Sequence, residues 1–236
     1  EFASHGYPTL LTTTTHIMKP DFLSDESYIE NEDLGQLANI FTNLKKNTLP
    51  LAALGIPEKV VNSNIKWRSP SSDFCEKIAE FSKKFSTKNP YKFFKILCEG
   101  DGSKRLPIKL PKDGEPVFFP KTDTVIGVIG LSCLGKPIKE TLFRYELLPN
   151  LTSLDNYFIK SLQSADIVTT DFLYRLCLSE KGLRKNITSQ KFCIIFNQAD
   201  ILDEKALAEV ITLRNQLQTK GICSHIISVK NNYIIN

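Results

Sequence analysis

The stretch FFKILCEGDGSKRLPIKLP, residues 93–111, joins a short apolar run to a loop that carries charges of both signs. The apolar run is long enough for a buried strand and too short for a helix. Two carboxylates, Glu99 and Asp101, stand where the chain leaves this predicted strand, and Gly102 allows the backbone to approach a ligand closely. Three cations follow at once: Lys104, Arg105 and Lys109. Acids at a strand end followed by bases predict a site for a Mg²⁺-bound phosphate.

A second polar group follows the apolar start of residues 10–18, where four threonines stand in a row at 12–15. Hydroxyls at the carboxyl end of a parallel strand can ligate Mg²⁺, so Thr15 joins Glu99 and Asp101 as a predicted metal ligand. Two plainer interpretations stay open. The charged loop can be a tight turn with solvated side chains, and threonine favours strands for packing reasons alone.

Apolar runs alternate with helical periodicity along the chain, which predicts an α/β fold. Trp67, inside the irregular segment 56–70, is interpreted as a packing anchor. The predicted strands are 10–18, 51–55, 93–98, 122–131, 191–197 and 223–229, and the predicted helices are 33–46, 71–86, 155–163, 170–177 and 203–220. Strands that are apolar along their whole length predict one mostly parallel sheet with helices on both faces, three layers in a single domain over residues 1–236.

Ligands in such sheets bind at the carboxyl ends of the strands. The polar groups at 12–15, 99–102, 130–136 and 197–200 each follow a predicted strand. We therefore expect all four groups along one edge of the sheet. The glycines and lysine of 130–136 have the wrong spacing for a Walker A phosphate loop.

Composition excludes some classes of protein. The chain has 236 residues, 42% of them hydrophobic, and no apolar run long enough to span a membrane. A net charge of +4 is too mild to indicate nucleic-acid binding. The six cysteines are scattered without a Cys-x-x-Cys pair, which predicts buried core residues in a reducing, cytoplasmic compartment and neither a disulfide framework nor a zinc site.

The tetrapeptide Asn197-Gln-Ala-Asp200 resembles the Asn-Lys-x-Asp base-recognition motif of P-loop GTPases. The resemblance implies that Asp200 accepts hydrogen bonds from a guanine edge and that Asn197 braces the loop. Gln198 stands where that motif has a lysine, so the resemblance leaves ATP and GTP both open as the nucleotide.

Taken together, the segments at 12–17, 99–111, 124–131, 134–137 and 197–200 resemble, in this order, the YqeC family of accessory proteins for selenium-dependent molybdenum hydroxylases. The resemblance implies a P-loop NTPase-like fold. Family members typically begin with a Gly-rich phosphate loop ending in Gly-Lys-Thr, one helix before the threonine-rich strand. Residues 1–6 are typical of a last helical turn closed by a glycine, so we expect the natural protein to continue upstream.

The first hypothesis is a nucleotide-binding accessory protein, an NTPase or nucleotide-dependent transferase that helps to mature the hydroxylase. Mg²⁺ and ATP or GTP would be its ligands, with Glu99 and Asp101 as catalytic residues. The nucleotide-binding set would be Gly102, Lys104, Arg105, Lys109, Asn197 and Asp200. The cations would offset phosphate charge or hold a molybdopterin-type cofactor.

The alternative is a non-catalytic module that delivers a cofactor and docks on the hydroxylase or on its cofactor-maturation proteins. A third hypothesis, a sulfur- or selenium-transferring enzyme that uses Cys98 or Cys133, is disfavoured because both cysteines lie in or beside apolar runs and are expected to be buried. No nucleic acid and no membrane is expected among the partners.

Overall fold

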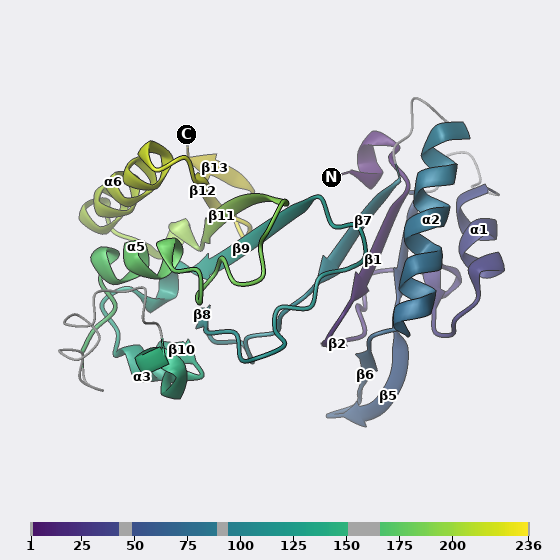
Figure 1. Ribbon diagram of the computed structural model, residues 1–236, viewed down its shortest axis with the longest axis horizontal. Coiled ribbons are helices and arrows are strands. Elements are labelled where there is room, and N and C mark those ends of the chain that lie inside the picture. Colours follow the sequence, from purple (N-terminus) through teal and green to yellow (C-terminus); the bar gives the residue numbers. More distant parts are fainter. Residues whose placement is uncertain (1, 43–48, 89–93, 151–165, 236) are drawn as a thin grey trace. The chain divides into compact units, whose positions relative to one another are not determined.

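The computed structural model describes residues 2–42, 49–88, 94–150 and 166–235 (Figure 1). The chain divides into two compact units. Unit 1 comprises Glu1–Gly102 and Val117–Lys121, and unit 2 comprises Ser103–Pro116 and Thr122–Asn236. Each unit has a sheet of its own with parallel strands, so the structure is α/β but does not have the single sheet that the sequence predicted.

The main sheet of unit 1 is parallel and has the strand order β3-β4-β1-β7. Its strands are β1 (Thr9–Thr13), β3 (Tyr28–Ile29), β4 (Leu51–Leu54) and β7 (Lys95–Glu99). The neighbours β1 and β7 end together, because Thr13 lies opposite Glu99 in the ladder. The predicted strand 10–18 is thus two strands, separated at residues 14–15.

Helices α1 (Leu34–Thr42) and α2 (Ser72–Lys88) pack against one face of this sheet (Figure 1). Their apolar positions, such as Leu37 and Ile78, are fully buried with Leu10 of β1. The helical periodicity at 71–86 is confirmed, and that at 33–46 is confirmed as far as Thr42, where the described residues end.

The other face of the unit 1 sheet is covered by an antiparallel sheet of β2 (His16–Met18), β6 (Asn64–Arg68) and β5 (Ile56–Val61). Trp67 on β6 is fully buried and meets the ring of Tyr28 edge-on, with centroids 5.9 Å apart. The packing role of Trp67 is confirmed, whereas the prediction of an irregular segment 56–70 is wrong. The prediction of helices on both faces of the sheet is also wrong for unit 1, because the β2-β6-β5 sheet covers the face where a second layer of helices was expected.

The main sheet of unit 2 has the order β13-β12-β11-β9. Its strands are β9 (Thr124–Gly130), β11 (Lys191–Asn197), β12 (Cys223–Ser228) and β13 (Tyr233–Ile235). The first three are parallel, which confirms three predicted strands, and β13 adds an antiparallel edge.

Helices α5 (Thr170–Leu178) and α6 (Glu204–Thr219) cover one face of this sheet. Thr169 and Asp203 cap them by accepting hydrogen bonds from the backbone N–H groups of Phe172 and Ala206. On the opposite face Ile126 and Val128 are more than half exposed. The predicted helix 155–163 lies outside the described residues.

The remaining elements are short. Strands β8 (Ile108–Lys109) and β10 (Leu142–Phe143) pair in parallel next to α3 (Ile138–Thr141). The 3₁₀ helices are η1 (Ala3–His5), η2 (Asp25–Ser27), η3 (Leu131–Cys133), η4 (Tyr145–Asn150) and η5 (Ala199–Ile201). Gly6 closes η1 with a φ of 81°, which confirms the expected helical turn ended by a glycine.

The cysteines divide by exposure. Cys75, Cys133 and Cys177 are buried as predicted, but Cys98 and Cys193 are half-buried and Cys223 is exposed. All six are free thiols. Within the described ranges, the helices are too short or too polar to cross a membrane.

Candidate functional site

In unit 2 the loops that follow β9, β11 and β12 meet at the carboxyl edge of the sheet. We call residues 130–132, 197–200 and 228–231 the unit 2 edge. Asn197 lies opposite Gly130 in the ladder. Its side-chain oxygen accepts hydrogen bonds from the backbone N–H groups of Gln198 at 2.8 Å and Val229 at 3.2 Å. Asn197 thereby ties the loop after β11 to the loop after β12.

Gln198 links the same loop to the end of β9. Its backbone is left-handed, with a φ of 71°, and its side-chain oxygen accepts a hydrogen bond of 3.3 Å from the N–H of Ser132. A Cβ on Gly130 would lie 2.8 Å from this oxygen and 3.0 Å from Pro107. A side chain at position 130 would displace the Gln198 oxygen and press against Pro107.

Asp200 is oriented by the third loop. Its Oδ1 accepts a hydrogen bond of 2.6 Å from the hydroxyl of Ser228, which is itself buried and accepts one of 3.1 Å from the N–H of Asn231. Asp200 is half-buried, and its Oδ2 accepts no hydrogen bond from the described part of the chain. A fixed carboxylate with one oxygen available can accept N–H donors from a ligand.

In unit 1 the ends of β1 and β7 form a second polar edge. We call residues 12–15 and 99–102 the unit 1 edge. The hydroxyl of Thr13 donates to the carbonyl of Glu99 at 3.1 Å, and the hydroxyl of Thr14 donates to that of Val117 at 2.5 Å. The N–H of Thr15 donates to the Thr13 hydroxyl at 2.9 Å. The hydroxyls of Thr13 and Thr14 therefore bond to backbone carbonyls at and beside the strand ends.

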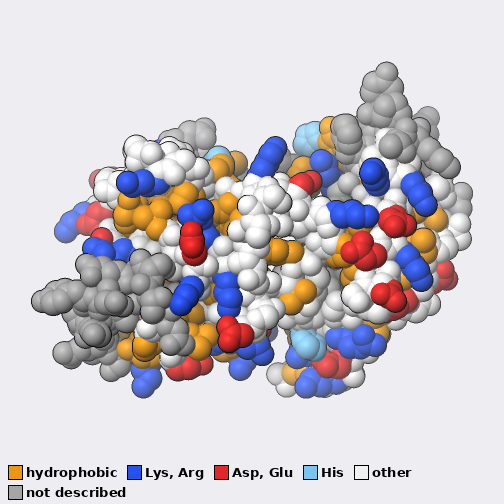
Figure 2. All heavy atoms as spheres, in the orientation of Figure 1, with side chains coloured by type: hydrophobic (Ala, Val, Ile, Leu, Met, Phe, Trp, Pro, Cys, Tyr) orange, Lys and Arg blue, Asp and Glu red, His pale blue; other side chains and the backbone are white. Residues whose placement is uncertain are grey.

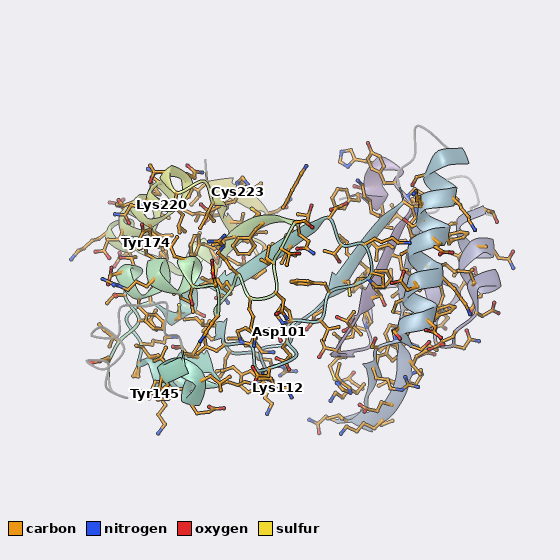
Figure 3. All side chains as sticks on the ribbon, viewed as in Figure 1. Asp101, Lys112, Tyr145, Tyr174, Lys220 and Cys223 are labelled. Carbon is orange, nitrogen blue, oxygen red and sulfur yellow. The ribbon has the colours of Figure 1, made fainter. Side chains whose placement is uncertain are left out.

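The carboxylates of the unit 1 edge lie at the end of β7, which Glu99 closes, and in the loop after it, which holds Asp101. Glu99 is exposed and Asp101, labelled in Figure 3, is half-buried. A Cβ on Gly102 would meet a carboxylate oxygen of Glu99 at 3.3 Å, so the Glu99 side chain turns back over its own loop. Carboxylate oxygens are the hard ligand atoms that Mg²⁺ prefers.

The four predicted groups are therefore brought together in pairs. Residues 12–15 and 99–102 share the unit 1 edge, and residues 130–132 and 197–200 share the unit 2 edge. The prediction of one sheet edge that carries all four is wrong, because their strands belong to two sheets.

The predicted cations also separate. Lys104 and Arg105 are exposed, in left-handed backbone with φ of 52° and 66°, and the Lys104 Nζ lies 5.0 Å from the centre of the Phe143 ring. Lys109 is buried, and its Nζ lies 2.8 Å from Oε2 of Glu115. Glu115 is therefore an ion-pair partner of Lys109, and the role of Lys109 toward a phosphate stays a prediction.

Glu115 is the centre of a partly buried charge cluster. Arg144 holds both of its oxygens, with Nη1 on Oε2 and Nη2 at 2.9 Å from Oε1. These hydrogen bonds, with that of Lys109, lower the pKa of Glu115 to about 2, although burial opposes the change. Burial lowers the pKa of Lys109, against the pull of Glu115. Neither Glu115 nor Arg144 was predicted from the sequence, because each is a charged residue without a distinctive motif around it.

A shallow pocket of about 370 Å³ lies elsewhere in unit 1 and includes none of the predicted site residues. Its polar wall includes Lys19 and Glu30, which pair at 3.0 Å. Over the face shown in Figure 2, acidic and basic side chains are interspersed.

Searches of curated proteins and of solved structures found no match to this chain. A family model described as YqeC protein matches residues 1–146, which span unit 1 and continue through β9 and β10 of unit 2. The matched segment is more than half of the 236 residues and includes the threonine run, the acidic loop and Gly130. The chain therefore belongs to the YqeC protein family.

Proposed function

We propose that this protein binds a purine nucleoside triphosphate and acts as an accessory protein in the maturation of a selenium-dependent molybdenum hydroxylase. The observation that carries the proposal is the unit 2 edge, where Ser228 fixes Asp200 and Asn197 braces the loop. A braced carboxylate of this kind suits the N–H donors on the edge of a purine base. Membership of the YqeC family supports the accessory role.

Mg²⁺ would be held at the unit 1 edge by the carboxylates of Glu99 and Asp101, with Thr15 as a further oxygen donor. Each offers the oxygen chemistry that this ion prefers. At this edge, taken by itself, bound Mg²⁺ would offset the charge of an anionic ligand. Lys104 and Arg105, which are exposed, would attract anionic groups.

The alternative function, a module that delivers a cofactor without turning over a nucleotide, is favoured by one observation. Lys109 is buried and its Nζ pairs with Glu115, so one of the three predicted cations already has an ion-pair partner within unit 2. An enzyme that transfers a phosphoryl group needs positive charge positioned on the transition state. A module that only carries a cofactor has no transition state to stabilise.

The test is an equilibrium titration of the full chain with Mg-ATP, Mg-GTP and Mg-pyrophosphate. The proposal expects one nucleotide to bind more tightly than pyrophosphate, because only a nucleotide has a base for Asp200 to contact. Equal affinities for all three ligands would contradict it. Release of phosphate at a steady rate would identify an NTPase, and nucleotide binding without turnover would favour the non-catalytic module.

A further inference from the structure

Three side chains with soft or borderline metal-binding atoms lie together on the β11–β12 ladder of unit 2. Cys193 of β11 is directly opposite Cys223 of β12, and His225 follows two residues later on the same face. Figure 3 labels Cys223 on β12. The two sulfurs and a ring nitrogen all lie within 4.8 Å of one another, and Sγ of Cys223 is 3.5 Å from Nε2 of His225.

The cluster lies on the sheet face opposite α5 and α6. Cys223 and His225 are exposed and Cys193 is half-buried, so an ion in solution can reach all three. Ile126 of β9 lies beside Cys193 in the ladder, and Val128 lies beside Ile195, the neighbour of His225. These apolar side chains flank the three ligands and offer no competing carboxylate.

Cys193 and Cys223 place two thiols side by side on the ladder. Two adjacent thiols cannot both ionise cheaply unless a cation lies between them. A bound divalent cation removes that obstacle, because it deprotonates coordinating thiols.

We propose that Cys193, Cys223 and His225 form a binding site for a thiophilic d¹⁰ cation, with Zn²⁺ as the ion to test. Zn–S bonds of about 2.3 Å and Zn–N bonds of about 2.0–2.1 Å on a tetrahedron separate ligand atoms by roughly 3.3–3.8 Å. The observed sulfur–nitrogen distance of 3.5 Å lies in that range. Binding would release the two thiol protons to solvent.

Three protein ligands leave the fourth tetrahedral position open on an exposed face. Sites of this composition keep water or an exogenous ligand there, whereas closed structural sites use four protein ligands. The proposal is independent of nucleotide binding. The cluster also lies outside residues 1–146, the part that matches the YqeC family model.

The test uses the reduced full chain, with Zn²⁺ measured by competition against a chromophoric chelator and Co²⁺ as a spectroscopic probe. We expect one ion per chain and a thiolate-to-Co²⁺ charge-transfer band. Loss of an outer-sphere partner already costs a metal site about 10–100-fold in affinity, so Cys223→Ser and His225→Ala should each weaken Zn²⁺ binding by at least about 100-fold.

Both substitutions change exposed side chains, and circular dichroism would verify that the fold is retained. The matched control is Cys98→Ser, a half-buried strand cysteine of unit 1, which should leave Zn²⁺ affinity unchanged. The proposal would be overturned if the reduced wild-type protein bound no Zn²⁺ at one equivalent. It would also be overturned if the Cys223→Ser variant bound Zn²⁺ as tightly as the wild type. Isolation of the protein with a Cys193–Cys223 disulfide that excludes metal even under reductant would overturn it as well.

Discussion

The hydroxyl of Ser228, at the end of β12, donates a hydrogen bond of 2.6 Å to Oδ1 of Asp200, which lies 28 residues earlier in the loop after β11. Ser228 is 1% exposed, so this bond is formed at the boundary of the core and fixes one oxygen of a half-buried carboxylate. In our account the other oxygen faces the base of a nucleotide.

Ser228→Ala should therefore loosen Asp200 without removing it. One such hydrogen bond contributes about 1 kcal/mol. The free energy of unfolding should therefore fall by about 1 kcal/mol, and nucleotide affinity should fall roughly fivefold. The matched control is Ser224→Ala on the same strand, since Ser224 is equally buried but donates to the carbonyl of Arg214. A loss of nucleotide affinity in both variants alike would indicate a general effect on β12.

Glu115→Gln should remove a pH dependence of stability. The folded-state pKa of Glu115 is lowered from 4.5 to about 2, so its contribution is complete above pH 4.5 and is lost as the pH falls toward 2. At neutral pH the variant removes the carboxylate charge that Lys109 and Arg144 share in this partly buried cluster, which should cost about 3–5 kcal/mol.

Urea unfolding at a series of pH values measures this difference between wild type and Glu115→Gln. The difference should be largest at neutral pH and should shrink as the pH falls below 4.5. Asp113→Asn is the control, because Asp113 is fully exposed in the same segment. A difference that does not depend on pH would show that the Glu115 carboxylate is not the stabilising charge.

Gly55→Ala should destabilise unit 1. A Cβ at this position would lie 2.3 Å from Cε3 of Trp67, which has no room to move because it is fully buried. Overpacking of a core costs about 1–3 kcal/mol. Trp67 is the chain's one tryptophan, so its fluorescence reports the unfolding of unit 1. Val60→Ala on the neighbouring strand, 70% exposed, should change stability by less than about 0.5 kcal/mol.

Arg105→Gln should weaken binding of a molybdopterin-type cofactor and leave nucleotide affinity nearly unchanged. Arg105 is exposed and its charge is available to an anion, and added salt should weaken the cofactor more than the nucleotide. Lys112→Gln is the control, because it removes an exposed cation from the same segment of unit 2, Ser103–Pro116. Cofactor binding that is unchanged in Arg105→Gln at low ionic strength would leave this loop as solvated surface.

Much of the local structure could be predicted from the sequence, because strands such as 191–197 and helices such as 203–220 carry strong apolar patterns. The β5–β6 hairpin could not be predicted from the sequence. Pro57 and Lys59 interrupt the apolar alternation of β5, and the turn depends on left-handed backbone at Asn62 and Ser63. The division into two sheets also could not, because strand order depends on long-range pairing, as between β1 and β7.

Some residues of the candidate sites could be predicted from the sequence and others could not. Asn197 and Asp200 could be identified because a short motif follows a strand. Ser228, which orients Asp200, could not, because a single serine at a strand end has no distinctive pattern. Cys193 and Cys223 lie in or beside apolar runs, which indicate burial. The one contrary signal is the two-residue spacing of Cys223 and His225, which places these two side chains on the same exposed face of β12.

The most direct test of nucleotide recognition compares Asp200→Ala with wild type in titrations of the preferred Mg-nucleotide and of Mg-pyrophosphate. Asp171→Ala, which removes an exposed carboxylate from α5, is the matched control. Loss of a charged hydrogen-bond acceptor costs about 1.5–3 kcal/mol, so Asp200→Ala should weaken the nucleotide roughly 10- to 100-fold and leave pyrophosphate unchanged. Equal losses for nucleotide and pyrophosphate, or no loss for either, would contradict the assignment of Asp200 to base recognition.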